Sequence, residues 1–207
     1  GDVYKRQLLD NPRRITPVAL NIGVRNARGD VIIIVGAHIF VASDFISKNV
    51  ACLSRTGAAC VGGPIQIISR SLMGKAISMA MSCPFGVGDS LYRYSRKEQY
   101  VDTVQNPAYR REVFERVGYF DEELVRNQDI EFNYRLRQSG GKILLTPEVR
   151  SYYYPRSSLK GLWRQNFANG FWNIKTMRKT PGSLSARHFV PLIFVIALGV
   201  SFLLSPF

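Results

Sequence analysis

The sequence predicts an α/β domain followed by a membrane-associated C-terminal region. Two observations predict the domain: a continuous β-branched run at residues 31–35, and a strand–helix–strand pattern that ends near residue 61. A third observation, the nineteen uncharged residues 189–207, predicts the membrane association. The chain has 207 residues, of which 46% are hydrophobic, so it is too apolar to be disordered and long enough to bury a core.

A βαβ unit opens the predicted domain. Residues 31–35 have the uninterrupted apolar character of a strand that is buried in a parallel sheet. Ser43 or Asp44 caps the following helix, Gly57 ends it, and residues 58–61 form the next strand. The side chains expected on the buried face of this helix are Phe45, Ile46, Val50 and Leu53.

The rest of the domain alternates short helices with short strands. Gly118 ends one helix, and Gly140 and Gly141 cap the next one, which turns Phe132 and Leu136 inward. The expected elements are a strand at 65–68, a helix at 72–81, a flexible loop at 85–88, helices at 110–117 and 129–138, and strands at 142–145 and 149–154.

A long amphipathic helix is predicted at residues 158–178. Apolar and aromatic side chains recur there at intervals of three or four residues, which places them on one stripe. Such a helix lies at a membrane interface or packs on its own domain, and the sequence leaves both possibilities open. The stripe consists of Leu159, Trp163, Phe167, Phe171 and Ile174.

The apolar residues 189–207 are preceded by a strongly basic region. The chain has a net charge of +13, and no acidic residue follows Glu148. By the positive-inside rule we expect a membrane segment whose preceding domain is cytoplasmic, with a buried C-terminal helix as the alternative. A nucleic-acid binder is the weaker interpretation, because the basic region leads straight into an apolar segment. The basic residues are Arg150, Arg156, Lys160, Arg164, Lys175, Arg178, Lys179 and Arg187.

Two places in the sequence carry groups suited to catalysis. His38 follows the predicted strand at the carboxyl edge of the sheet, where α/β proteins bind ligands, and its imidazole is suited to a metal. Asp129 lies in the first turn of a helix, whose dipole favours the ionised carboxylate that a general base needs; helix capping is the alternative. Glu131 and Arg135 are spaced as a surface ion pair.

Several motifs occur in an order that resembles one known family. Residues 19–30 precede the first strand and Ala37-His38, residues 110–122 precede Asn-Gln-Asp129, and a Tyr-Tyr-Pro-Arg156 motif precedes Arg164-Gln165. From about Asn11 onward this set resembles glycosyltransferase family 2 with the GT-A fold, in its succinoglycan and exopolysaccharide subgroup. The resemblance places the protein at the bacterial plasma membrane.

The resemblance implies transfer of a sugar, with inversion, from a nucleotide-diphospho-sugar such as a UDP-hexose. The acceptor is then a hydroxyl of a lipid-linked sugar or polysaccharide. Membrane-surface charge is an equal alternative for Arg164. The implied roles are general base for Asp129, donor or diphosphate binding for Asp30, His38, Arg164 and Gln165, and acceptor binding for Asp102 and Arg135.

The family's metal-binding motif is altered in this chain. It holds a divalent cation, Mg²⁺ or Mn²⁺, which binds the donor diphosphate, and it reads Asp-Ala-His in the subgroup. Here it reads Gly36-Ala37-His38, so His38 is the remaining ligand. Either catalysis is impaired, or the metal is held differently, or the codon was misread. The alternative function is therefore a non-catalytic membrane-associated relative that serves as a scaffold.

The resemblance also divides the chain into segments. The first βα units of the family, which bind the nucleotide, would precede Asn11, so we expect a fragment that binds donor weakly and is unstable alone. The expected segments are a sequencing-adapter remnant at 1–7, the back part of a GT-A domain at 8–155, an amphipathic interfacial region at 156–186, and a truncated transmembrane segment at 187–207.

Overall fold

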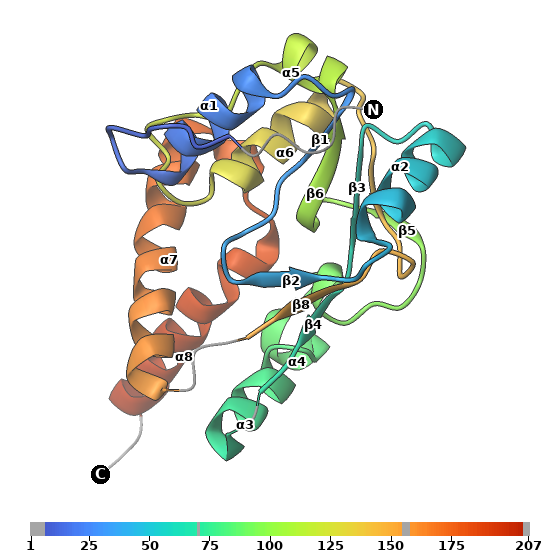
Figure 1. Ribbon diagram of the computed structural model, residues 1–207. Coiled ribbons are helices and arrows are strands. Elements are labelled where there is room, and N and C mark those ends of the chain that lie inside the picture. Colours follow the sequence, from blue (N-terminus) through green and yellow to red (C-terminus); the bar gives the residue numbers. More distant parts are fainter. Residues whose placement is uncertain (1–6, 70, 155–157, 205–207) are drawn as a thin grey trace.

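The computed structural model describes residues 7–69, 71–154 and 158–204; all but one residue of the predicted remnant, together with Arg156 and residues 205–207, lie outside them. A five-stranded sheet forms the centre of the domain (Figure 1). In spatial order its strands are β1 (Val31–Ile33), β6 (Gln105–Arg110), β3 (Cys60–Gly63), β7 (Ile143–Leu145) and β5 (Gln99–Val101).

The interior strand β6, second in this order, was not predicted. It pairs antiparallel with both β1 and β3, so these two strands are parallel to each other but not adjacent. The predicted βαβ unit therefore has the right direction, while its strands are separated by one inserted strand. Pro107 and the left-handed Asn106, with φ 48°, interrupt the apolar alternation that would have revealed β6.

A second, three-stranded sheet follows the first. The predicted strand at 31–35 ends early, at Ile33, and the chain resumes after residues 36–38 as β2. The Asn106 amide donates to Ser151 Oγ at 3.1 Å and joins the two sheets. The strands, in spatial order, are β2 (Ile39–Val41), β8 (Ser151–Tyr153) and β4 (Ile65–Ile67).

Helices cover both faces of the large sheet (Figure 1). Helix α2 (Phe45–Thr56) packs on one face and ends at Gly57, whose backbone is left-handed as predicted. Of the four residues predicted on its buried face, Phe45 and Leu53 are buried, whereas Ile46 and Val50 are exposed, because the buried residues recur at four-, seven- and eight-residue spacing. These are Phe45, Asn49, Cys52 and Leu53.

A larger hydrophobic cluster fills the space on the other face of the large sheet. Phe120, Phe132 and Leu136 are buried there, the last two as predicted from the sequence. The helices on this side are α1 (Thr16–Asn26), α5 (Arg111–Val117) and α6 (Gln128–Gln138).

A helical excursion between β4 and β5 leaves the sheets. It contains α3 (Leu72–Ala80), the short helix α4 (Pro84–Val87), and a 3₁₀ turn, η1 (Leu91–Arg93). Ser71 caps α3 by accepting a hydrogen bond from the Gly74 N–H. The loop predicted at 85–88 is thus partly helical, because Pro84 starts a helical turn.

The C-terminal region consists of two helices joined by two 3₁₀ turns, α7 (Leu159–Lys179), η2 (Pro181–Ser183), η3 (Ala186–His188) and α8 (Val190–Leu204). On α7 only Thr176 is buried, and the predicted stripe is exposed, so the helix does not pack on its domain through that stripe. Every residue of α8 is outside the core. Within the described ranges, no helix has both the length and the apolar composition to cross a membrane.

Candidate active site

The start of α6 carries Asp129 in its first turn, as predicted. Asn127, directly before the helix, has a left-handed backbone with φ 63°. Its side-chain amide donates to Asn173 Oδ1 at 2.8 Å and to Thr176 Oγ1 at 3.3 Å. Because both acceptors belong to α7, this long helix holds the end of α6 that presents Asp129.

The middle of α6 is tied to the central sheet by a buried hydrogen-bond chain. Tyr109 Oη donates to Asn133 Oδ1 at 2.8 Å, and Asn133 Nδ2 donates to Thr103 Oγ1 at 2.9 Å. All three side chains are buried, so breaking the chain would leave unpaired polar groups. Thr103 follows Asp102, so the same network fixes the Asp129 helix relative to Asp102.

The Asp129 carboxylate combines solvent access with strong desolvation. The side chain is exposed, yet the protein around it raises its pKa above the ordinary value by burial. Backbone N–H groups at the helix start and nearby His188 act in the opposite direction but do not outweigh burial. The sequence argument weighed only the helix dipole, and the net shift is the reverse of what the dipole alone predicts.

Asp102 lies in the turn between β5 and β6 and is held by the segment before α8. Arg187 Nη2 donates to Asp102 Oδ2 at 2.5 Å, and Ser185 Oγ donates to the same oxygen at 3.0 Å. The other end of the guanidinium donates to Asp89 Oδ1 at 2.8 Å, and this bond lowers the pKa of Asp89. The Arg187 side chain is only 10% exposed, so it joins the two acidic loops from within the protein.

His188 follows Arg187 and completes this cluster. The Ser185 N–H donates to His188 Nδ1 at 3.1 Å, and burial lowers the pKa of the imidazole, which is therefore neutral at pH 7. The sequence analysis did not assign either residue to the site, and it counted Arg187 among the basic residues that precede a membrane segment. The available signal was the Arg-His pair itself, directly in front of the apolar segment.

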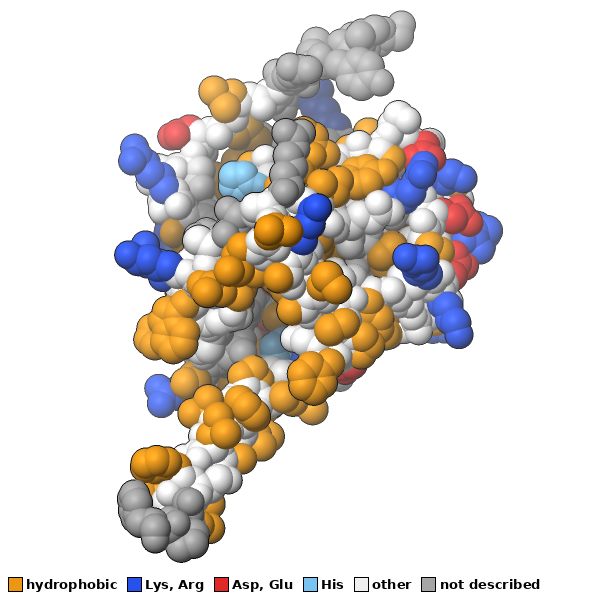
Figure 2. Space-filling view, turned by 90° about the horizontal axis from the view of Figure 1, so that it is seen from below, with side chains coloured by type: hydrophobic (Ala, Val, Ile, Leu, Met, Phe, Trp, Pro, Cys, Tyr) orange, Lys and Arg blue, Asp and Glu red, His pale blue; other side chains and the backbone are white. Residues whose placement is uncertain are grey.

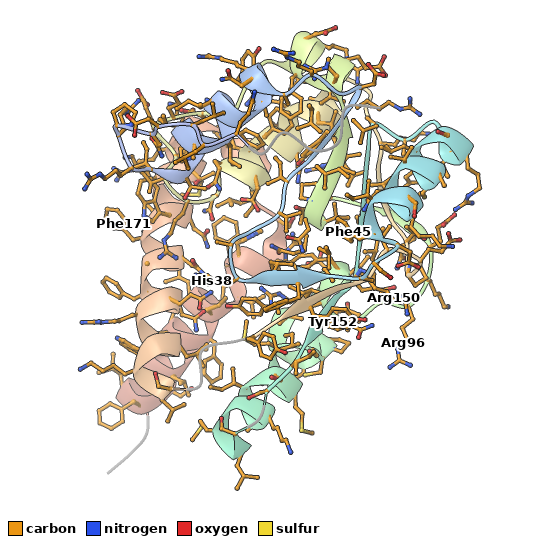
Figure 3. All side chains as sticks on the ribbon, viewed as in Figure 1. His38, Phe45, Arg96, Arg150, Tyr152 and Phe171 are labelled. Carbon is orange, nitrogen blue, oxygen red and sulfur yellow. The ribbon has the colours of Figure 1, made fainter. Side chains whose placement is uncertain are left out.

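The residues expected to bind the donor are not gathered in one place. His38 is exposed in the turn between β1 and β2, and Figure 3 shows it in the space between β2 and α7. Asp30 is exposed before the first residue of β1, whereas His38 follows the other end of that strand. The extended strand thus separates Asp30 from His38.

A metal site cannot be completed from the side chains that the structure describes. Within those ranges, no three His, Cys, Asp or Glu side chains come close enough to hold an ion. Gly36 offers no ligand, and a lone imidazole is a poor ligand for Mg²⁺. The residues present therefore do not fit the divalent-cation site that the resemblance implies.

Arg135 pairs with Glu131, as predicted. The pair does not lie on the surface, as the prediction had it, because Glu131 is buried. Arg135 Nε and Nη2 donate to the two oxygens of Glu131 at 2.6 and 2.9 Å, and the Glu131 side chain is buried. Nη1 and Nη2 also donate to the carbonyls of Val117 and Tyr119. The guanidinium thus fixes the loop after α5, and it is not directed at an acceptor.

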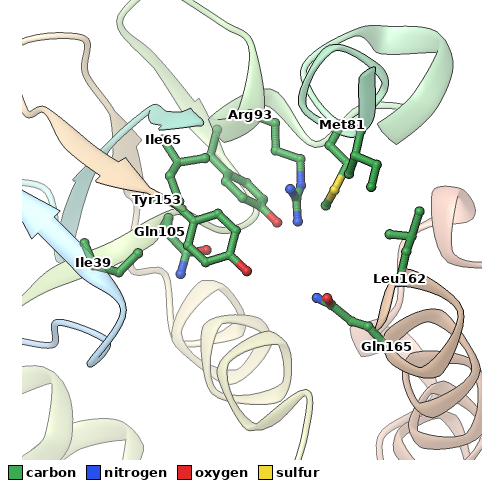
Figure 4. Close-up of a pocket in the computed structure, with 10 residues that line it drawn as sticks. Ile39, Ile65, Met81, Arg93, Gln105, Tyr153, Leu162 and Gln165 are labelled. Carbon is green, nitrogen blue, oxygen red and sulfur yellow. The ribbon is translucent and has the colours of Figure 1, made fainter. Parts of the chain in front are cut away.

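A cavity of about 190 Å³ lies between the three-stranded sheet, α3, η1 and α7. Figure 4 shows Arg93, Tyr153 and Gln165 directed into it from different sides. It adjoins the site residues, since Ile39 and Gln105, which also line it, are close in sequence to His38 and Asp102. Arg164 is exposed and does not line the cavity, because neighbouring helical residues face different directions.

Comparison with known proteins decides the family. The model of the family described as "Glycosyl transferase family 2" matches residues 6–118, more than half of the chain. The chain belongs to glycosyltransferase family 2. This family-2 chain is 32% identical over 194 residues to the succinoglycan biosynthesis protein ExoA of Rhizobium meliloti (strain 1021), covering 92% of the chain and 59% of that relative.

A second relative of the family-2 chain comes from Methanococcus voltae. It is named dolichyl N-acetyl-α-D-glucosaminyl phosphate 3-β-D-2,3-diacetamido-2,3-dideoxy-β-D-glucuronosyltransferase, and it is 32% identical over 170 residues. The match covers 79% of the chain and 53% of that relative. The family-2 chain thus spans between half and three-fifths of the length of these two relatives.

The fold is similar to that of a solved glycosyltransferase. The crystal structure of GalNAc-T7 with UDP, GalNAc and Mn²⁺ matches with a TM-score of 0.52 and 19% identity, covering 71% of the family-2 chain and 32% of that structure. This likeness concerns the fold alone, and it confirms the predicted mixed α/β, GT-A class.

Proposed function

We propose that the protein transfers a sugar from a nucleotide-diphospho-sugar to an acceptor hydroxyl, with Asp129 as general base. The observation that carries the proposal is the Asp129 carboxylate, which is exposed, has a raised pKa and is fixed through Asn127 and Asn133. In its ionised form, a carboxylate with a raised pKa accepts a proton more readily than an ordinary carboxylate.

The proposed reaction begins with proton transfer to this base. Asp129 takes the proton of the acceptor hydroxyl while the oxygen attacks the anomeric carbon of the donor. The bond from that carbon to the diphosphate breaks, and the nucleoside diphosphate leaves with the electron pair, so the anomeric configuration inverts. A UDP-hexose donor is supported by family membership and by the UDP in the solved GalNAc-T7 structure.

The acceptor is proposed to be a sugar linked to a lipid phosphate. The name of the Methanococcus voltae relative supports it, because it describes a dolichyl phosphate-linked sugar as acceptor. Asp102 is the proposed acceptor-binding group: Arg187 and Ser185 both engage Oδ2, which leaves Oδ1 to accept from a sugar hydroxyl. Arg135 is not part of this proposal, because its donors are all directed into the protein.

The donor diphosphate is proposed to lie between His38 and Gln165. His38 is exposed in the space that faces α7, and Gln165 is directed from α7 into the adjoining cavity (Figures 3 and 4). Asp30 is too far along β1 to join them. We assign no step to a divalent cation, because the described residues do not form a site for one.

We further propose that α7 and α8 attach the protein to the bacterial plasma membrane, with the α/β domain on the cytoplasmic side. Trp163 and Phe167 are 73% and 72% exposed, and α8 exposes large apolar side chains all along its length. Figure 2, which views the lower end of Figure 1, shows hydrophobic side chains gathered there. The basic residues of this region, including Arg164, suit anionic headgroups.

Sugar transfer by the detergent-extracted protein, measured with labelled UDP-hexose and a lipid-linked acceptor, tests the activity. The Asp129→Asn variant is expected to lose a hundredfold or more, which is roughly the contribution of a general base. Asp44→Asn is the matched control, since Asp44 is a partly exposed carboxylate that pairs with Arg150. Equal activity of wild type and Asp129→Asn would overturn the role of Asp129.

One observation favours a second candidate function. Gly36 stands where the subgroup has a carboxylate, and no metal cluster forms among the described residues. A non-catalytic relative that acts as a scaffold at the membrane would have this feature. It predicts no turnover by the wild-type protein with any UDP-hexose, together with recovery of glycan synthesis in deletion cells by Asp129→Asn.

A further inference from the structure

Arg93 differs from most of the other partly buried arginines of the domain; Arg137, whose Nε is buried without a hydrogen-bond partner, is the exception. Those at 110, 111, 135 and 187 each donate to carbonyls or carboxylates at normal hydrogen-bond distance. The Arg93 guanidinium has no hydrogen-bond or ion-pair partner anywhere in the part of the chain that the structure describes. It lies over the ring of Tyr92, with Cζ 5.2 Å from the ring centroid.

The surroundings of Arg93 make this lack of a partner costly. The side chain is half-buried and lines the 190 Å³ cavity, whose walls carry no carboxylate. A positive charge that is removed from water without a partner is unfavourable, so the arrangement favours an anion in the cavity. Gln165 and Tyr153 Oη face the same space and can donate to the same anion (Figure 4).

Apart from Gln105 and the Tyr92 hydroxyl, the remaining walls of the cavity are apolar. Ile65 comes from β4, Ile77 and Met81 come from α3 and the residue after it, and Leu162 comes from α7. A bare anion such as inorganic phosphate would leave these walls without a partner. A phosphate that carries a hydrocarbon chain satisfies both kinds of wall at once.

The two helices that border the cavity also expose apolar side chains outward. On α3, Leu72 is 86% and Met79 is 75% exposed, and on α7 the exposed Trp163 follows the cavity residue Leu162. In Figure 1, α3 and the first turns of α7 lie at the same end of the molecule as the end of α8. A hydrocarbon chain that leaves the cavity there stays beside apolar side chains.

From these observations we propose that the Arg93 cavity binds the phosphate and first isoprenoid units of a prenyl-phosphate-linked acceptor. This inference rests on the proposed function, since it names where the lipid end of the acceptor lies while the reacting hydroxyl meets Asp129. Arg93 recognises the phosphate of the acceptor, and this phosphate takes no part in the transfer reaction.

Binding of farnesyl phosphate to the detergent-extracted full chain tests the proposal, with farnesol, inorganic phosphate and UDP as comparison ligands. Arg93→Gln is expected to weaken farnesyl phosphate binding about tenfold to a hundredfold, as for loss of a charged hydrogen bond, and Arg93→Lys is expected to restore part of it. Farnesol binding is expected to be equal in all variants. Arg96→Gln is the matched control, since Arg96 is exposed and points away from the domain (Figure 3).

Three results would overturn the inference: unchanged farnesyl phosphate binding by a folded Arg93→Gln variant, competition by inorganic phosphate at equal concentration, or competition by UDP. The last result would mean that the cavity is a donor site. Thermal unfolding of each variant shows that it is folded. Arg93-dependent binding in a protein that transfers no sugar would support this site and reject the proposed function. Efficient transfer to a phosphate-free glycan, unaffected by Arg93→Gln, would support the proposed function and reject this site.

Discussion

Arg187 binds Asp102 across 85 residues of sequence, with Nη2 at 2.5 Å from Oδ2. The same guanidinium binds Asp89, and both acidic residues belong to loops of the α/β domain. Arg187 itself lies three residues before α8. The segment in front of the apolar helix is therefore a structural part of the candidate active site.

Loss of the Arg187 guanidinium is expected to free the Asp102 side chain. In Arg187→Gln the two carboxylates lose their shared partner, so we expect a destabilisation of about 1–3 kcal/mol and a several-fold higher KM for the acceptor. Steady-state kinetics and thermal unfolding measure the two effects. The control is Arg178→Gln, whose arginine is exposed on α7. An unchanged acceptor KM in a destabilised variant would make Arg187 purely structural.

The raised pKa of Asp129 predicts a specific pH dependence of the transfer rate. A general base must be ionised, so the rate falls as the pH drops through the pKa of Asp129, which lies above the ordinary 3.8. The pH profile of kcat/KM for the acceptor measures this limb. A limb at or below pH 3.8 would contradict the raised pKa.

The same shift has an effect on stability with the opposite sign to that of a salt-bridged aspartate. Burial favours the protonated form of Asp129. Its contribution to the free energy of unfolding is therefore fully present below its unfolded-state pKa, and this contribution is lost as the pH rises through its folded-state pKa. Asp129→Asn is therefore expected to be more stable than wild type at pH 7 and no more stable near pH 3. Denaturant unfolding at the two pH values tests the sign.

Gly36 can be replaced by a carboxylate without a clash. A Cβ built at this position meets only Ile39 Cγ1, at an ordinary 3.4 Å. We expect Gly36→Asp to fold normally and to bind Mn²⁺ beside His38, which electron paramagnetic resonance detects without any turnover. Gly36→Asn is the neutral, equally sized control. If neither variant binds Mn²⁺, the turn before β2 is not the place where a carboxylate completes a metal site.

The exposed stripe of α7 predicts that membrane binding can be reduced without loss of stability. The double change Trp163→Ser and Phe167→Ser removes two large apolar side chains that cover no core. Flotation with liposomes of anionic lipids is expected to show weaker binding, and thermal unfolding is expected to be unchanged. Tyr100→Ser, at a half-exposed side chain on edge strand β5, is the control and should bind like wild type.

The sequence predicted those helices whose apolar periodicity and end residues lie within the helix itself. The apolar pattern and glycine ends gave α2, α5, α6 and α7 close to their observed bounds, and the first turn of α6 placed Asp129. Strand β6 was not predicted because its pairing partners lie 42–79 residues away in the sequence, and Pro107 interrupts its apolar pattern. The Arg187 cluster escaped for the same reason, since nothing near Arg187 in sequence indicates Asp89 or Asp102.

The hydrogen bond from Asn127 to Asn173 sets the position of the start of α6 relative to α7. It links the base-bearing end of α6 to the helix that carries the apolar stripe, so the height of Asp129 above that stripe is fixed. With the stripe in the headgroup layer, as proposed above, the base stands at one set distance from the lipid phosphates. On the proposed function, acceptors would then be selected by length, because a hydroxyl would reach Asp129 only when the glycan between it and the lipid has the matching number of sugars.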